Sequence, residues 1–121
     1  MPRPILDERC LHPAIRSLVE TNQQAIVQEV MAAIKSNDVV VVGMGFNPFP
    51  KQACKALDEI KQPYKYLEYG NYFNNWRKRN ALKMWTGWPT FPMVFVKGTL
   101  IGGADDLKAL IANGEFKKLL A

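Results

Sequence analysis

The sequence is poor in the residues that form disulfides or bind metal ions. Its 121 residues include only two cysteines and one histidine. Cys10 and Cys54 lie far apart and show no motif spacing, which indicates reduced thiols in the cytoplasm rather than a disulfide framework. Cys10 lies near His12, but there are too few further cysteines and histidines to complete a tetrahedral zinc site. The sequence therefore predicts no metal site.

Long apolar runs are also missing. No run approaches the roughly 18–20 apolar residues that a membrane-spanning helix needs. The first ten residues contain two acids and two arginines, so we expect neither a secretory leader nor a membrane partner. The chain carries a net charge of +5, which favours anionic partners in general. Its length, with 48% apolar and 22% charged residues, is typical of one globular domain.

A β-hairpin is predicted in the second half of the chain, within residues 85–106. Residues 93–96, Met-Val-Phe-Val, are rich in β-branched and aromatic side chains and indicate a buried strand. Lys97 and Gly98 then form a two-residue turn. Residues 99–101 return as the second strand of the hairpin.

A strand–helix–strand unit is predicted before this hairpin. Four consecutive valines at 39–42 suit a central strand that is buried on both faces. A helix at about 48–61 and a second strand at 64–69 follow, so these two strands should be parallel. Two further helices are expected earlier, one opening at Pro13 and one from residue 21 or 22 to about residue 35.

The order of these features resembles the second half of glutaredoxins, most closely the monothiol branch. The resemblance is carried by Trp88-Pro89-Thr90-Phe91-Pro92, a strand, a Lys-Gly turn, a second strand, and Gly102-Gly103-Ala104-Asp105. It can be followed from about Val39 to Leu120. Residues 85–106 are its most specific part.

This resemblance implies a thioredoxin-like α/β fold. We expect a four-stranded mixed sheet in the order 64–69, 39–42, 93–96 and 99–101, flanked by helices on both faces. An extra N-terminal helix is expected in addition. Residues 1–20 are interpreted as an N-terminal extension and residues 21–121 as the glutaredoxin-like domain.

The resemblance also implies that the usual thiol has been replaced. Glutaredoxins carry Cys-Pro-Tyr-Cys or Cys-Gly-Phe-Ser where the first strand leads into its helix, and the helix N-terminus favours a thiolate there. In this chain Asn47 replaces the first cysteine, and Pro50 replaces the second cysteine or the serine. Asparagine is a good N-cap but neither a nucleophile nor an iron ligand. We therefore expect no catalytic residue and no iron–sulfur cluster, with Cys54 half-buried and inert.

A glutathione-binding groove is a further implication of the resemblance. Arg79 and Lys83 are expected on one face of a basic helix over 74–85, where they would hold the glycine carboxylate of glutathione without supporting the fold. Phe91 would offer its backbone to the cysteinyl part, beside a cis Pro92. Lys51 would partly replace a family lysine that is missing here. The predicted glutathione-binding residues are Lys51, Arg79, Lys83, Thr90, Phe91, Pro92, Gly103, Ala104 and Asp105.

Three classes of function fit these patterns. The first is a protein that binds glutathione, or a glutathionylated partner, with little or no thiol–disulfide oxidoreductase activity. The second is a monothiol-type redox or iron–sulfur protein that uses another cysteine. The third is a protein-interaction module that keeps the scaffold without ligand binding. Trp76 and Trp85 interleave with basic residues, but one short basic helix is weak support for nucleic-acid binding, and we expect no nucleic-acid partner.

Overall fold

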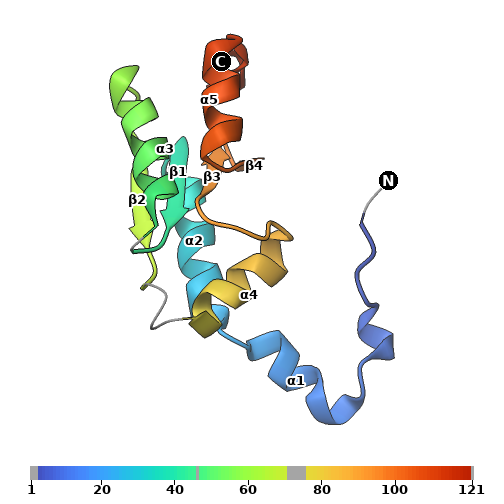
Figure 1. Cartoon of the computed structure of the whole chain (residues 1–121). Helices are drawn as coiled ribbons and strands as arrows, with labels where there is room; N and C mark the ends of the chain where they lie inside the picture. The colour runs from blue at the N-terminus through green and yellow to red at the C-terminus, as the bar shows by residue number, and fades with distance from the viewer. Residues whose placement is uncertain (1–2, 46, 71–75, 121) are drawn as a thin grey trace.

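The protein forms a four-stranded sheet with helices on both faces (Figure 1). This computed structural model describes residues 3–45, 47–70 and 76–120. Its elements, in chain order, are η1 (Glu8–Cys10), α1 (Pro13–Thr21), α2 (Gln24–Ser36), β1 (Val39–Gly43), α3 (Pro48–Glu59), β2 (Lys65–Glu68), α4 (Trp76–Thr86), β3 (Met93–Val96), β4 (Thr99–Gly102), α5 (Ala104–Ala112) and α6 (Glu115–Leu120).

The strand order is β2-β1-β3-β4, as the sequence predicts. β1 pairs with β2 in parallel, which confirms the strand–helix–strand unit. β3 runs antiparallel to both β1 and β4. Val41 of β1 lies between Tyr66 and Val94 in this register, so β1 is a central strand.

Each face of the sheet carries its own hydrophobic core. Successive side chains of a strand point to opposite faces. Val40 and Val42 therefore pack in the cluster that contains Ile26 and Val30 of α2 and Leu82 of α4. On the other face, a second cluster is formed by Val39, Val41, Ala53, Leu57, Val94, Val96, Ala104, Leu107 and Phe116. The four valines are fully buried, as expected for a strand covered on both sides.

The turn between β3 and β4 has the geometry that its residues favour. Lys97 and Gly98 both adopt positive φ, of 51° and 82°. Two successive positive φ angles are typical of a type I′ turn, which suits the twist of a tight hairpin. The Lys97 N–H also donates to the Asp38 carbonyl at 2.7 Å, which ties the turn to the residue before β1.

Several boundaries and short elements differ from the sequence-based predictions. The predicted basic helix begins at Trp76 in the described chain, and residues 74–75 lie outside it. The short elements η1 and α6 were not predicted, because three to six residues show too little periodicity. The boundary proposed after residue 20 falls at the last turn of α1 and stays a prediction.

The N-terminal part extends away from the two cores. α1 is capped by His12 Nδ1, which accepts from the Ala14 N–H at 3.0 Å, and it buries none of its side chains. In Figure 1, α1 and the segment before it reach beyond the sheet and its helices. Among the described residues, no helix is long and apolar enough to cross a membrane.

The junction between β4 and α5 depends on a glycine. Gly102 has a φ of 115°, which other residues rarely adopt. An added Cβ there would collide with the Asp106 carboxylate, which accepts the Gly103 N–H at 2.9 Å at the start of α5. Because Gly102 has no side chain, the Asp106 carboxylate can come close enough to accept the Gly103 N–H and cap α5.

We predict that Gly102→Ala lowers the free energy of unfolding by about 2–4 kcal/mol, since backbone strain and loss of the cap add together. Gly114→Ala is the matched control, because Gly114 has a φ of 81° and nothing within 4 Å of an added Cβ. This control should lose only about 1–2 kcal/mol. Urea unfolding of both variants checks the difference, and equal losses would contradict it.

Candidate functional site

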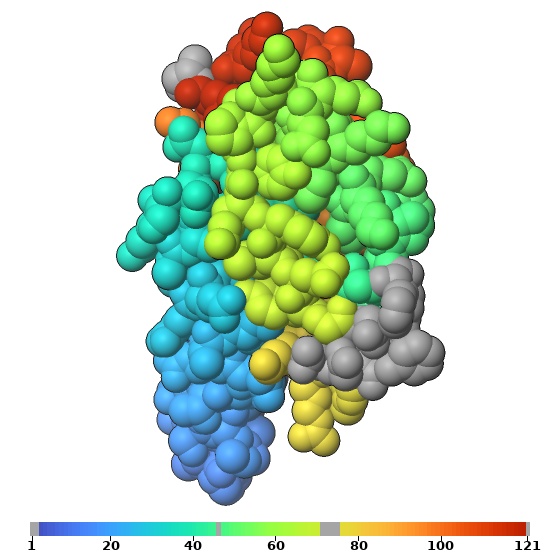
Figure 2. Space-filling view, turned by 90° about the vertical axis from the view of Figure 1, so that its left-hand side faces the viewer, coloured from blue at the N-terminus to red at the C-terminus, as the bar shows by residue number. Residues whose placement is uncertain are grey.

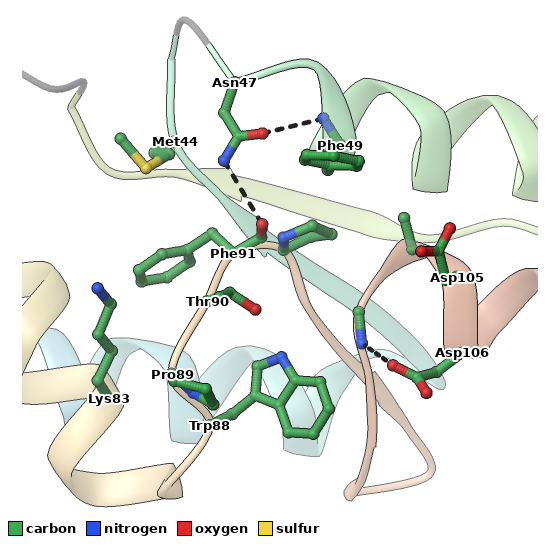
Figure 3. Close-up of a pocket in the computed structure, with 13 residues that line it drawn as sticks. Met44, Asn47, Phe49, Lys83, Trp88, Pro89, Thr90, Phe91, Asp105 and Asp106 are labelled. Carbon is green, nitrogen blue, oxygen red and sulfur yellow. Dashed lines mark hydrogen bonds between the residues drawn. The ribbon is translucent and has the colours of Figure 1, made fainter.

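A cavity of about 490 Å³ lies where β1 ends and the helices α3 and α5 begin (Figure 3). Its volume falls within the range of small-ligand sites. Its walls come from the segment after β1, the start of α3, the middle of α4, the loop before β3 and the start of α5. The lining residues are Met44, Asn47, Phe49, Lys83, Trp88, Pro89, Thr90, Phe91, Pro92, Gly103, Ala104, Asp105 and Asp106.

Asn47 joins two walls of this cavity. Its Oδ1 accepts the Phe49 N–H at 3.0 Å, so Asn47 is the N-cap of α3, as predicted. Its Nδ2 donates to the Phe91 carbonyl at 3.5 Å, a long bond across the cavity wall (Figure 3). The amide therefore stabilises the helix start and also holds the loop before β3.

The loop before β3 presents backbone to the cavity. The Phe91–Pro92 peptide bond is cis, which confirms the prediction for Pro92. The Phe91 side chain is buried, and the Lys83 Nζ lies 5.8 Å from the centre of its ring. Lys83 therefore brings a positive charge beside Phe91 and makes a cation–π contact with it.

The start of α5 forms the opposite wall. Asp105 and Asp106 are exposed in the first turn, and Asp106 accepts the Gly103 N–H (Figure 3). The first N–H groups of a helix lack intrahelical acceptors and carry partial positive charge. The cavity thus faces the N-terminus of α5 and Lys83 on one hand, and the carboxylates of Asp105 and Asp106 on the other. The start of α3 contributes little positive charge, because Pro48 and Pro50 have no N–H and the Phe49 N–H is bonded to Asn47. The cavity suits a small ligand with both carboxylate and ammonium groups.

Trp88 belongs to both the core and the cavity. It packs against the α2-side cluster and lines the cavity. Its Nε1 is buried and has no hydrogen-bond partner among the residues that the structure describes. Trp88 is therefore both a core aromatic residue and a residue of the candidate site.

Most of the predicted site residues meet in this cavity. The structure brings together Asn47, Lys83, Thr90, Phe91, Pro92, Gly103, Ala104 and Asp105. Lys51 is exposed on α3 and does not line the cavity. Pro50 is buried behind it and packs on Gly43, where an added Cβ would lie 2.7 Å from the Pro50 Cβ.

Arg79 differs most from its predicted place. Its side chain is only 7% exposed, and its Nη1 donates to the Tyr69 carbonyl at 3.1 Å. It does not line the cavity, whereas Lys83 does. The helical spacing of four residues did not reveal that the Tyr69 carbonyl would face Arg79. Of the two residues predicted to hold the glycine carboxylate, only Lys83 therefore lines the cavity.

Five lining residues were not among the predicted site residues: Met44, Phe49, Trp88, Pro89 and Asp106. Trp88 and Pro89 belong to the motif that carries the resemblance, and Asp106 follows it directly. Met44 and Phe49 flank Asn47 in sequence. Their proximity to the motif residues is therefore the signal that could have identified them from the sequence.

Neither cysteine lies in the cavity wall. Cys54 is half-buried in α3, and burial raises the pKa of its thiol, although a hydrogen bond with Tyr64 partly opposes this. A raised pKa leaves less thiolate at neutral pH. Cys10 is exposed in η1, and no group of three or more His, Cys, Asp or Glu side chains that could hold a metal ion occurs in the described ranges.

Comparisons of sequence give a consistent result. The sequence model of the family described as Glutaredoxin matches residues 39–101. A glutaredoxin-like protein of Dictyostelium discoideum is 48% identical over 92 residues, covering 76% of this chain and 75% of its own. A probable monothiol glutaredoxin 2 of Rickettsia felis is 34% identical over 92 residues, covering 72% of this chain and 86% of its own.

Comparisons of structure agree. The structure of oxidized glutaredoxin 2 from Chlamydomonas reinhardtii matches with a TM-score of 0.70 and 32% identity, over 82% of this chain and 94% of its own. A complex of buckwheat glutaredoxin with glutathione matches with a TM-score of 0.72 and 25% identity, over 84% and 92%. These matches confirm the thioredoxin-like fold predicted from the sequence.

Because Arg79 is buried and bonded to a backbone carbonyl, its removal should affect the fold as well. We predict that Arg79→Ala lowers the free energy of unfolding by about 1–3 kcal/mol, since the Tyr69 carbonyl loses a charged donor. Lys83→Ala is the control on the same helix and should lose less than about 1 kcal/mol. Urea unfolding measures both, and a stable Arg79→Ala protein would show that this hydrogen bond is unimportant.

Proposed function

Because the chain belongs to the glutaredoxin family, we propose that it binds glutathione, or a glutathionylated partner, in the cavity beside Asn47. We further propose that it does so with little or no thiol–disulfide oxidoreductase activity. The observation that carries this proposal is the position of Asn47, the N-cap of α3 in the cavity wall. The family resemblance assigns this position to the nucleophilic cysteine.

The proposed binding mode follows from the charges of the lining. The Lys83 ammonium pairs with the glycine carboxylate of glutathione. The Phe91 backbone bonds to the cysteinyl part, and its carbonyl has a second lone pair for this beside the one used by Asn47. The Asp105 carboxylate pairs with the ammonium group of the γ-glutamyl residue of glutathione. The carboxylate of that same glutathione residue lies near the first N–H groups of α5.

Arg79 has a different role in this proposal from the one the sequence predicted. Its buried hydrogen bond to Tyr69 positions α4, and therefore Lys83, relative to the chain that follows β2. It acts on the ligand through Lys83 rather than by direct contact.

The competing functions receive less support. A redox protein that uses Cys54 is disfavoured because this thiol lies outside the cavity wall and has a raised pKa. An iron–sulfur cluster needs thiolate ligands, which Asn47 does not supply, so we expect none. A pure interaction module is disfavoured by the combination of Lys83, Phe91 and Asp105 in one cavity. We place the protein in the cytoplasm, where its thiols remain reduced.

We predict that reduced glutathione shifts the amide NMR signals of Trp88, Thr90, Phe91 and residues 103–105 on titration. Lys83→Ala should weaken this binding by about 1–3 kcal/mol, the value of a hydrogen bond to a charged group. Lys78→Ala is the matched control, because Lys78 is an exposed cation of α4 that does not line the cavity. No binding by the unaltered protein would favour the interaction module.

A second prediction tests whether the thiol is all that has been lost. Asn47→Cys places a thiol at the N-terminus of α3, where the helix dipole and Lys83 should lower its pKa below the roughly 8.5 of a free cysteine. This thiolate should attack oxidised glutathione, forming a protein–glutathione mixed disulfide and releasing one reduced glutathione. Mass spectrometry detects the adduct, and the rate of adduct formation against pH gives the thiol pKa.

The matched control is Asn47→Ser, which keeps an N-cap of similar size but no sulfur. It should be as stable as the Asn47→Cys protein or more so, and should form no adduct at position 47. Both variants keep Cys10 and Cys54, so adducts at these positions appear equally in each. If the Asn47→Cys protein forms its adduct at position 47 no faster than the one at the exposed Cys10, the cavity does not recognise glutathione.

A further inference from the structure

A second surface of the molecule lies outside the candidate site, between α1, the start of α2 and α4. Two hollows form it. One, of about 570 Å³, includes Leu18, Val19, Met84 and Trp85 in its lining. The other, of about 340 Å³, is lined in part by Trp76, Arg77 and Met84. We call these six residues and the two hollows that they line the α1–α4 surface.

The two hollows adjoin each other. Both are lined by Asn22 and Met84. α2 packs against α4, and Figure 2 shows gold atoms of α4 beside the blue atoms of the N-terminal helices. The smaller hollow also shares Lys83 with the cavity beside Asn47. The two hollows and the cavity therefore follow one another along α4.

This surface exposes large apolar side chains. Trp76, Met84 and Leu18 are 56%, 62% and 65% exposed, and Val19 and Trp85 are also open to solvent. α1 has an apolar side yet buries nothing. Clustered exposed apolar groups of this kind, with tryptophan and methionine among them, are typical of protein-binding surfaces.

The smaller hollow of this surface is positively charged. Arg77 and Lys83 line it with no acidic residue among the described lining, whereas Glu20 lines the larger hollow. Among the described residues, Arg77, Lys78 and Lys83 make no ion pair with an acid. The Arg77 guanidinium lies 5.3 Å from the centre of the Trp76 ring. Charge and aromatic area are therefore combined at one end of α4.

We propose that the α1–α4 surface binds an acidic polypeptide segment that carries apolar side chains. Its acidic residues lie over the smaller hollow, against Arg77 and Lys83. Its apolar residues enter the larger hollow, between Leu18, Val19 and Met84. The attraction between opposite charges speeds the association of the segment with this surface and sets the direction in which the segment lies. The apolar contacts supply most of the affinity. This inference does not rest on glutathione binding.

Two other occupants fit less well. A nucleic acid would place phosphates near Glu20, which lines the larger hollow together with apolar side chains. A second copy of the chain, joined symmetrically through this surface, would bring the basic ends of two α4 helices toward each other. An acidic segment with apolar groups satisfies both hollows at once.

The test uses three synthetic peptides and an oligonucleotide. The probe is a peptide of repeated Glu-Glu-Leu-Glu-Phe, compared with one in which lysine replaces glutamate and one in which serine replaces leucine and phenylalanine. We expect only the probe to shift the amide NMR signals of α1 and α4, with an affinity that falls as salt is added. Equal binding of the serine peptide or of single-stranded DNA at the same residues would overturn the proposal.

Matched variants separate the two contributions. Arg77→Glu and Met84→Ala should each weaken probe binding about fivefold or more. Lys55→Glu, the same change of charge on α3 across the sheet, and Ile60→Ala, an exposed apolar residue after α3, should have little effect. Equal effects of Arg77→Glu and Lys55→Glu would show a general charge effect and overturn the proposal.

The outcome is independent of the proposed function. Arg77→Glu and Met84→Ala should leave the glutathione-induced shifts of Trp88, Thr90 and Phe91 in place, because neither residue lines that cavity. Failure of glutathione to bind leaves the peptide result interpretable. Self-association of the chain that Met84→Ala abolishes, measured by sedimentation, would assign the surface to a second copy and overturn the proposal.

Discussion

The burial of β1 on both of its faces is the constraint on which this structure depends. Its four valines are inaccessible to solvent, two in each hydrophobic cluster. A strand with no polar side chain along its length can be stable only between two layers of helices. Both layers therefore converge on β1, and the chain that leaves it must turn into α3 at Asn47. The candidate site lies at this exit because the core is arranged around the strand that leads there.

The regular part of the fold was predictable because short-range patterns determine it. A run of four valines, a Lys-Gly turn and an Asn-Pro helix start each favour one local structure. The place of Arg79 was not predictable in this way. Helical spacing puts Arg79 and Lys83 on similar sides of α4, but the Tyr69 carbonyl that accepts from Arg79 is brought there by the tertiary fold. A buried backbone acceptor leaves no pattern in the sequence near the arginine.

The same contrast applies to the cavity wall. Most of its predicted members come from one contiguous motif, and the hairpin geometry holds them together. Lys51 belongs to a different element and was expected there only to replace a missing charge. On α3 it is exposed outside the cavity wall, while its neighbour Pro50 takes the buried place against Gly43. Predictions within one structural unit were therefore more successful than those that joined two units by charge alone.

Asn47 contacts two parts of the candidate site with one side chain. The first N–H groups of α3 need an acceptor, and Asn47 Oδ1 supplies one to Phe49. The amide nitrogen of the same side chain makes a long hydrogen bond of 3.5 Å to the Phe91 carbonyl in the loop before β3. A cysteine at this position would offer a thiolate to the helix N-terminus but no amide donor to the Phe91 carbonyl. The asparagine therefore favours a stable cavity wall, whereas a cysteine favours reactivity.

Lys83 lines both the cavity beside Asn47 and the smaller hollow of the α1–α4 surface. An anion that binds Lys83 in one of these sites therefore changes the positive charge available to a ligand in the other. Such coupling between the two sites would be reciprocal, because each ligand changes the affinity for the other by the same factor.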